Sequence, residues 1–258
     1  MTKVVSIYNQ KGGVGKTTTN INLSAYVSLL GYKVLVIDAD PQGNTTSGFG
    51  FEKDNLESTL YDGMVNNISM EDIILKTRYE NLDLVPSDAN LAGAEIEINQ
   101  KSEKELRIRK LIDQLNEKYD YIFIDCPPSL GLISINALTA SHSVLIPIQC
   151  EYYAIEGVSQ LVKTIDLVRR GLQIPLEIEG IVLTMYDGRT NLSLQVAEEV
   201  RKFFKDKVFE TMIPRNVRLA EAPSYGETIE EYDSSSKGAI AYKELAEEFI
   251  KKGKDSGE

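Results

Sequence analysis

The chain has 258 residues, and its 28 basic and 39 acidic residues give a formal net charge of −11. Hydrophobic residues make up 42%, which is enough for a large core and excludes a wholly disordered chain. The two cysteines, Cys126 and Cys150, exclude a disulfide scaffold and fit a reducing cytoplasm. No uninterrupted apolar run approaches the roughly 18 residues of a transmembrane helix, so we expect no such helix.

Short apolar runs alternate with segments of helical period along the chain. In chain order we expect a strand at Val4–Tyr8, a helix at Thr17–Leu30, strands at Val34–Ile37 and Leu82–Val85, a helix at Glu103–Lys118, strands at Tyr121–Ile124 and Val144–Ile148, a helix at Ile155–Arg170, a strand at Ile178–Thr184, and helices at Leu192–Phe204 and Ala239–Ile250. This alternation predicts an α/β fold, with a mostly parallel twisted sheet and helices on both faces.

The same pattern predicts one domain over residues 1–250, followed by a polar tail at residues 251–258. The segment Phe49–Lys76 is weakly patterned, and we expect it to be an excursion on the surface.

The clearest motif is the run Lys11-Gly12-Gly13-Val14-Gly15-Lys16-Thr17-Thr18, which lies between an expected strand and an expected helix. That context is typical of a phosphate-binding loop, although a glycine turn with incidental Lys and Thr residues is the alternative. Glycines let successive backbone N–H groups turn inward around an anion, and the helix adds its positive end. We expect Lys16 to contact the β- and γ-phosphates and Thr17 to place its hydroxyl on Mg²⁺.

The loop departs from the usual phosphate-loop pattern at its start, because Gln10 stands where the first glycine would be. A second lysine, Lys11, stands at the mouth of the loop instead. A second positive charge beside Lys16 is costly unless both lysines meet phosphate. The departure therefore predicts a role for Lys11 at the nucleotide.

Acidic residues follow two of the expected strands. Asp125 comes directly after Tyr121–Ile124, at the carboxyl end of a strand, where ligands bind in open α/β sheets. A carboxylate there can hold Mg²⁺ through a water, although a helix cap or a turn is the alternative. Asp38 and Asp40 are two residues apart, so their side chains point the same way if the backbone is extended. A purely structural role for both of these residues stays open.

Four segments together resemble motifs of the ParA/MinD ATPases. The run Lys11–Thr18 resembles their deviant Walker A motif, Val36–Asn44 their switch I, and Tyr121–Ser129 their Walker B motif and switch II. Ile213–Gly226 resembles a late motif of the chromosomal ParA (Soj) branch. The match covers about residues 2 to 250, so the chain is similar to this family over almost its whole length.

The resemblance implies a single-domain P-loop NTPase that hydrolyses ATP to ADP and phosphate with Mg²⁺. It implies catalytic roles for Lys11, Lys16 and Asp40, with Asp40 orienting the attacking water or acting as the general base. We expect Asp38 to be structural, holding the loop or a nearby lysine. Mg²⁺ would lie at Thr17 and Asp125. The nucleotide would contact residues of the Walker A run and, around the adenine, Pro214 and Asn216: Lys11, Gly12, Gly13, Val14, Gly15, Lys16, Thr17, Thr18, Pro214 and Asn216. A plain proline loop is the alternative for the last two.

In the family, two monomers pack face to face with two ATP molecules between them. Lys11 would then contact the nucleotide of the partner, as an arginine finger does when it is supplied in trans. Gly12 would lie at the interface, where any side chain would obstruct the approach. The alternative for Lys11 is an ordinary solvated loop lysine.

The acidic chain contains one locally basic segment. Between Arg189 and Arg218 lie seven basic and four acidic residues, so this segment carries +3. A basic stripe can bind the DNA backbone without reading its sequence, and dimerisation would double the phosphate contacts. Arg189 and Arg218 fall where the Soj branch carries DNA-binding arginines. The alternative is a solvated helix face.

The resemblance further implies nonspecific binding to double-stranded DNA, a ParB-type centromere-binding partner that stimulates hydrolysis, and a cytoplasmic, nucleoid-associated location. It also implies regulation of the replication initiator and, in spore formers, of sporulation. Two other function classes stay open. One is a MinD-like membrane-associated division-site ATPase, although the acidic residues on Ala239–Ile250 would be repelled by acidic lipid. The other is a P-loop metabolic ligase or kinase.

Overall fold

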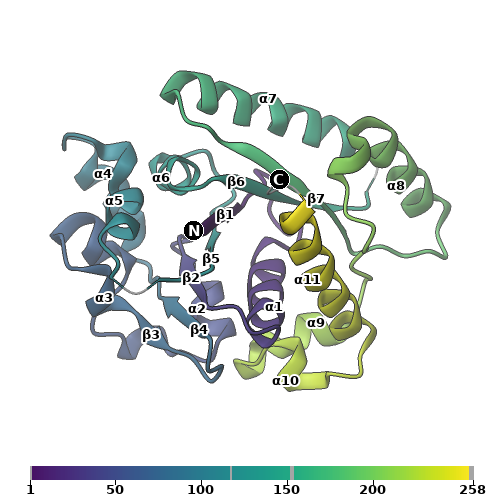
Figure 1. Cartoon of the computed structure of the whole chain (residues 1–258), viewed down its shortest axis with the longest axis horizontal. Coiled ribbons are helices and arrows are strands. Elements are labelled where there is room, and N and C mark those ends of the chain that lie inside the picture. The colour runs from purple at the N-terminus through teal and green to yellow at the C-terminus, as the bar shows by residue number, and fades with distance from the viewer. Residues whose placement is uncertain (1, 117, 152–153, 256–258) are drawn as a thin grey trace.

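The computed structural model of the chain describes residues 2–116, 118–151 and 154–255. These residues form a sheet of seven strands in the order β3-β4-β2-β5-β1-β6-β7 (Figure 1). The strands are β1 (Lys3–Ile7), β2 (Val34–Asp38), β3 (Leu75–Lys76), β4 (Leu82–Val85), β5 (Tyr121–Asp125), β6 (Ser143–Gln149) and β7 (Glu177–Thr184). All neighbouring strands are parallel except the short edge strand β3, which runs antiparallel to β4.

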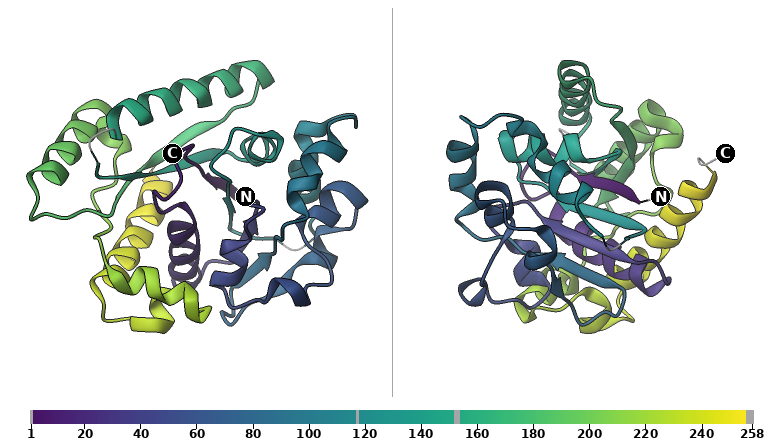
Figure 2. Two further views of the ribbon diagram at one scale, coloured as in Figure 1. Left: turned by 180° about the vertical axis from the view of Figure 1, so that it is seen from behind. Right: turned by 60° about the vertical axis from the view of Figure 1, so that its left-hand side comes forward.

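Helices cover both faces of this sheet. The α-helices are α1 (Lys16–Leu29), α2 (Asn44–Gly48), α3 (Met70–Ile73), α4 (Leu91–Ile98), α5 (Arg107–Asp113), α6 (Leu132–Ala140), α7 (Ala154–Leu172), α8 (Asn191–Phe204), α9 (Val217–Glu221), α10 (Ile229–Asp233) and α11 (Lys237–Asp255). Helices α1, α9, α10 and α11 lie on one face, and α4 to α7 lie on the other (Figure 2). The predicted α/β fold is therefore confirmed.

The core lies in two layers, one on each face of the sheet. Strand β2 makes the pattern clear, because Val34 and Val36 pack toward α1 and α11, while Leu35 and Ile37 pack toward α4 and α5. Successive side chains of a strand point to opposite faces, so a strand buried on both faces is a continuous apolar run. This explains why β2 and β5 are visible in the sequence as unbroken hydrophobic segments before their final aspartates.

The segment Phe49–Lys76 is not the surface excursion that its weak pattern suggested. Leu60, Met64, Met70 and Ile73 are all almost fully buried and belong to the core layer that α4 and α5 cover. The segment folds as short pieces, including a π-helical turn, α3 and β3. Pieces this short supply buried residues singly, so they produce no periodic signal.

The helix expected at Glu103–Lys118 is shorter than predicted. A 3₁₀ turn at Lys104–Leu106 precedes α5, which ends at Asp113. Beyond it, the Asn116 backbone N–H donates to the Glu71 carboxylate at 2.8 Å instead of to a carbonyl of the helix. Six of the described α-helices had no counterpart among the predicted elements: α2, α3, α4, α6, α9 and α10.

The last helix continues beyond the predicted boundary at Ile250. Helix α11 extends to Asp255, and residues 256–258 lie outside the described part of the chain. The division into a domain and a tail stays a prediction. Within the described residues, none of the helices has the length and apolar character needed to cross a membrane.

Candidate nucleotide-binding site

Three neighbouring strands bring the predicted site residues to one edge of the sheet. In the register of the sheet, Asp125 at the end of β5 pairs with Ile7 of β1 on one side and with Asp38 of β2 on the other. The glycine loop follows β1 and leads into α1. This edge is the carboxyl end of the parallel strands, where open α/β sheets bind their ligands.

The glycine loop has the backbone conformation of an anion-binding turn. Gly13 and Gly15 adopt φ values of +74° and +88°, a region that glycine enters without steric cost. The first backbone bond of α1 joins the Thr19 N–H to the Gly15 carbonyl at 2.9 Å. The helix offers no acceptor for the N–H groups of residues 16–18, which are left to a ligand.

Lys16 is held inside this loop. Its side chain is almost buried, and Nζ donates to the carbonyl of Lys11 at 3.2 Å. Burial lowers the pKa of Lys16, and the nearby Asp125 carboxylate acts in the opposite direction. The ammonium group is thus partly desolvated beside the open amides of the loop.

Asp125 is fully buried and has one oxygen without a partner. Its Oδ2 accepts a hydrogen bond from the Thr45 hydroxyl at 2.7 Å, whereas Oδ1 has no hydrogen-bond partner among the described residues. Burial raises the pKa of Asp125 to about 6, and the hydroxyls of Thr45 and Thr17 oppose the shift. A buried carboxylate oxygen with no donor, beside a threonine hydroxyl, fits a hard divalent cation.

Asp125 does not belong to a larger cluster of metal-binding side chains in the part of the chain that the structure describes. No group of three or more His, Cys, Asp or Glu side chains within the described ranges is placed to hold a metal ion. Mg²⁺ is commonly bound through one or two carboxylates together with water and substrate phosphates. The donor set of Asp125 and Thr17 beside the glycine loop fits that arrangement.

Asp38 and Asp40 have different surroundings. Asp38 is fully buried and accepts three hydrogen bonds, from the Thr46 backbone N–H, the Thr46 hydroxyl and the Asp40 backbone N–H. Burial, followed by the charge of Asp125, raises the pKa of Asp38 to about 7. The carboxylate of Asp40 accepts from the backbone N–H of Gln42 at 2.9 Å. Asp38 therefore anchors the start of α2.

A cavity of about 310 Å³ opens beside the glycine loop. Its lining comes from the loop, the end of β7, the segment before and within α9, and α11: Gly15, Thr18, Thr184, Met185, Ile213, Pro214, Arg215, Asn216, Val217, Leu219, Ala220 and Tyr242. The predicted pair Pro214 and Asn216 lies in this wall. The Asn216 side-chain oxygen accepts from the Arg218 backbone N–H at 2.8 Å and caps α9, so its orientation is fixed.

Sequence reasoning missed most of this cavity. Thr184 ends a predicted strand, so its place at the ligand edge could have been inferred, and its hydroxyl donates to the Val14 carbonyl at 2.8 Å. Tyr242 comes from the last helix and reaches the cavity through packing of α11 on α1. No local pattern in the sequence indicates that contact.

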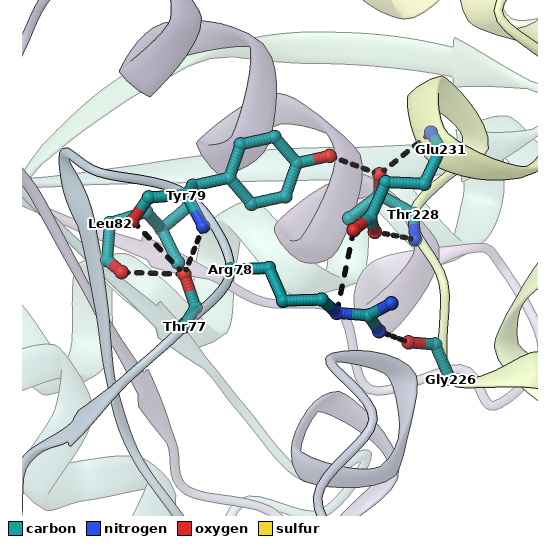
Figure 3. Close-up of polar contacts among 7 residues, drawn as sticks. All are labelled: Thr77, Arg78, Tyr79, Leu82, Gly226, Thr228 and Glu231. Carbon is teal, nitrogen blue, oxygen red and sulfur yellow. Dashed lines mark hydrogen bonds and ion pairs between the residues drawn. The ribbon is translucent and has the colours of Figure 1, made fainter.

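A clasp of polar contacts anchors the segment that follows α9 (Figure 3). Arg78, in the turn between β3 and β4, donates to the Gly226 carbonyl and lies 3.5 Å from the Glu231 carboxylate. The hydroxyls of Tyr79 and Thr228 are 2.5 Å apart, and Thr228 and Glu231 form a capping box at the start of α10. The clasp ties the end of the cavity-forming segment to the opposite edge of the sheet.

Comparison with known proteins places this site in a family. The family described as an AAA domain matches residues 2–178. The sporulation initiation inhibitor protein Soj of Bacillus subtilis (strain 168) is 55% identical over 98% of this chain and 100% of its own length. The chromosome partitioning protein ParA of Myxococcus xanthus (strain DK1622) is 50% identical over 97% of this chain and 88% of its own length. The chain belongs to the ParA/Soj family of chromosome-partitioning ATPases.

A solved structure supports the same assignment at the level of the fold. Cobyrinic acid a,c-diamide synthase from Mycobacterium smegmatis, with a bound ATP analog and magnesium, superposes with a TM-score of 0.86 and 34% identity. The superposition covers 99% of this chain and 97% of the other. The nearly complete overlap means that the ParA/Soj chain has the architecture of that nucleotide-bound protein throughout.

The side chain of Lys11 in this ParA/Soj chain contacts a residue outside its own loop. Its Nζ forms an ion pair with Glu151 at 2.7 Å, and both side chains are about half exposed. A Cβ added to the neighbouring Gly12 would meet nothing within 4 Å, so this side of the loop is open. The Lys11 side chain is thus exposed at the mouth of the loop, whereas the Lys16 side chain is enclosed.

The two predicted DNA-binding arginines are exposed and paired with nearby carboxylates. Arg189 contacts Asp187, and Arg218 lies 3.0 Å from Glu221. The charge of Arg215 also helps to lower the pKa of Asp187. The Arg215 backbone N–H donates to the Tyr186 carbonyl at 3.0 Å. The structure therefore brings the Arg189 loop beside the segment that leads into α9.

Proposed function

We propose that this chromosome-partitioning ATPase binds ATP with Mg²⁺, associates into a homodimer when ATP is bound, and binds double-stranded DNA without sequence preference in that state. One observation carries the proposal. The enclosed Lys16 lies close enough to Asp125 to feel its charge, Oδ1 of Asp125 has no partner among the described residues, and a cavity of about 310 Å³ opens beside them. The volume lies at the lower end of small-molecule sites and is suited to an adenine base.

Different residues bind the phosphates, the Mg²⁺ ion, the attacking water and the base. The open amides of residues 16–18 and the Lys16 ammonium bind phosphate oxygens, because donors that already face the loop need no rearrangement. Thr17 and Asp125 hold Mg²⁺, which neutralises charge on the phosphate oxygens when it is bound. Asp40 orients the attacking water, and Pro214 with Asn216 borders the base. Since the oxygen of Asn216 caps α9, its amide N–H groups are the free donors toward the base edge.

Lys11 acts across the dimer. Its exposed position and the empty space around Gly12 support an approach by a second protomer. In that dimer Lys11 leaves Glu151 and contacts the phosphates of the partner's nucleotide, where a positive charge stabilises the transferring group. Exchange of a half-exposed ion pair for a phosphate contact costs little, because exposed pairs contribute only about 0–1 kcal/mol.

DNA binding follows from dimerisation. Arg189, Arg215 and Arg218 lie on neighbouring segments, and each protomer adds the same set. Phosphate contacts of this kind are independent of sequence and weaken steeply with salt. A ParB-type partner then stimulates hydrolysis and releases the DNA, which gives a nucleoid-associated cycle. By similarity to Soj we extend the proposal to control of the replication initiator and, in spore formers, of sporulation.

The deciding experiment compares DNA binding by the wild type and Asp40→Ala with ATP, with ADP and without nucleotide. We expect Asp40→Ala to bind ATP without hydrolysing it, to elute as a dimer in gel filtration, and to bind DNA only with ATP. The wild type with ADP is the matched control and stays monomeric and unbound. If Asp40→Ala remains a monomer with ATP and Mg²⁺, the proposal is wrong.

The same proteins separate the other two function classes. ATP turnover that responds neither to DNA nor to a ParB-type partner would favour a metabolic ligase or kinase. Flotation with acidic vesicles in ATP would favour a MinD-like ATPase. Against the latter, Tyr242, Leu245 and Phe249 of α11 are buried in the core, and Glu248 accepts from the backbone of Glu210. The apolar side of this helix is thus already used for packing.

A further inference from the structure

Helix α2 is joined to the proposed metal carboxylate by one hydroxyl group. Thr45, the second residue of α2, is fully buried, and its Oγ1 donates to Asp125 Oδ2 at 2.7 Å. A threonine hydroxyl has a single proton, so the bond to Asp125 leaves Oγ1 only as an acceptor. The side-chain amide of Asn20 in α1 donates to that same oxygen at 3.4 Å.

Asn20, Thr45 and Asp125 are thus joined by two successive hydrogen bonds, in which Asn20 of α1 donates to Thr45 of α2 and Thr45 donates to Asp125 of β5. All three residues are fully buried, so water does not replace any of these contacts. We propose that Thr45 is a positioning residue for the metal site: it holds Oδ2 of Asp125, so that Oδ1 is the oxygen presented to the cation, and it links the cation's presence to α2. The inference rests on the proposed function, in which Asp125 holds Mg²⁺.

The adjacent threonine provides an internal comparison. The Thr46 hydroxyl donates to Asp38 Oδ2 at 2.7 Å, and its oxygen accepts from the Ser87 backbone N–H at 2.9 Å. The other oxygen of Asp38 accepts from the Asp40 backbone N–H. Asp38 therefore has no free oxygen, and Thr46 holds α2 in place without facing a ligand position. The two threonines are alike in size and burial but differ in which carboxylate they contact.

Charge explains why the Thr45 contact responds to a cation. A hydrogen bond to an ionised carboxylate is roughly twice as strong as a neutral one, so the Thr45 bond depends on the negative charge of Asp125. A divalent ion bound at Oδ1 attracts the negative charge of Asp125 and so weakens the hydrogen bond from Thr45 to Oδ2. Because Thr45 lies at the start of α2, that change in bond strength reaches the helix. The far end of α2 is fixed, because Gly50, which follows it, packs against the backbone of Gly226.

The test measures Mg²⁺ dependence of ADP binding rather than turnover. Isothermal titration of ADP over a Mg²⁺ series is compared among the wild type, Thr45→Val, Thr45→Ser and the matched control Thr46→Val. Outer-shell hydrogen-bond partners of metal ligands commonly change metal affinity by about 10- to 100-fold. We expect Thr45→Val to raise the half-saturating Mg²⁺ concentration about tenfold, Thr45→Ser to restore it, and Thr46→Val to leave it unchanged while lowering stability.

Binding of ADP in EDTA separates positioning from damage to the fold. We expect Thr45→Val to bind metal-free ADP as the wild type does. Equal loss of ADP affinity with and without Mg²⁺, or failure of Thr45→Ser to rescue, would overturn the inference. Wild-type ADP binding that does not depend on Mg²⁺ would instead contradict the proposed metal site itself, so the two failures are distinguishable.

Discussion

The guanidinium group of Arg189 binds both carboxylate oxygens of Asp187, with two hydrogen bonds of 2.8 Å each. The arginine side chain is 89% exposed, so this pair holds the group outward without enclosing it. Hydrogen bonds from Arg189 lower the pKa of Asp187 to about 2, so the carboxylate stays ionised at neutral pH. Any DNA phosphate that takes Arg189 must therefore compete with a fixed negative charge in the same loop.

This competition yields a prediction in two directions. Arg189→Glu should reduce ATP-dependent DNA binding at least tenfold, because each protomer of the dimer loses a phosphate contact and gains a repulsive charge. Asp187→Asn should tighten DNA binding, because the arginine charge is no longer neutralised. Fluorescence anisotropy with two unrelated duplexes over a salt series measures both effects.

Dimerisation is the control for the Arg189 variant. Gel filtration with ATP should give the same dimer for Arg189→Glu as for the wild type. Loss of dimer and DNA binding together would mean that Arg189 holds the fold rather than DNA.

Removal of each loop lysine should impair a different step of the ATPase cycle. Lys16 is enclosed by the loop, whereas Lys11 is exposed and paired with Glu151. Lys16→Ala should abolish ATP binding and every ATP-dependent property, because the enclosed ammonium is the only lysine group that donates within the described loop. Lys11→Ala should still bind ATP as a monomer but should neither dimerise nor hydrolyse it. Calorimetry gives the affinity and gel filtration gives the state of association; an unchanged ATP affinity and turnover in Lys16→Ala would refute the loop assignment.

Local patterns predicted the parts of the site that lie within one strand–loop–helix unit. The glycine loop and Asp125 are found from sequence because each follows an apolar run directly, and the sheet register then brings them together. The cavity wall is different. Tyr242 is separated from Gly15 by most of the chain, and only the packing of α11 on α1 joins them. Pairing of distant elements leaves no trace in a single local window.

The segment Phe49–Lys76 was wrongly predicted to lie on the surface because its buried residues occur one at a time along the chain. Leu60 and Met64 are completely buried, although their segment has neither a helical nor a strand period. They lie in short turns that fill the space beneath α4 and α5, so the surrounding polar residues conceal them in a hydropathy pattern. The ends of the predicted strands, by contrast, agree with the structure to within one residue, because the buried runs end abruptly at charged or polar residues such as Asp38 and Asp125.

The buried Asp125 should make the nucleotide-free protein less stable as the pH rises. Its pKa is about 6 in the folded protein and 3.8 in its ordinary state, so the folded chain holds the proton more tightly between these values. This contribution to stability is present below pH 3.8 and is lost as the pH rises through 6. A shift of this size corresponds to about 3 kcal/mol.

Asp125→Asn removes that titration. Urea unfolding in EDTA should show the variant to be more stable than the wild type at pH 8, by up to about 3 kcal/mol, with a smaller difference at pH 5. The same variant should lose stabilisation by Mg²⁺ and ADP, because its amide cannot replace the carboxylate at the cation. An equal difference in unfolding free energy at both pH values would mean that Asp125 is already ionised at pH 5.

Gly226, the glycine of the clasp, should tolerate a side chain poorly. Its φ is +65°, and a Cβ there would lie 2.6 Å from the Cα of Gly50, a backbone atom that cannot rotate aside. Gly226→Ala must therefore separate the segment after α2 from the segment after α9, and it weakens the bond from Arg78 to the Gly226 carbonyl.

Gly31 is the matched control, since its φ is +90° but a Cβ would meet nothing within 4 Å. The left-handed backbone alone costs about 1–2 kcal/mol for a residue with a side chain, so Gly31→Ala should lose about that much. Gly226→Ala should lose about 2 kcal/mol more in urea unfolding, within the range measured for overpacked sites. Equal losses in the two variants would mean that the contact between Gly50 and Gly226 relaxes freely and that the clasp does not fix the end of α2.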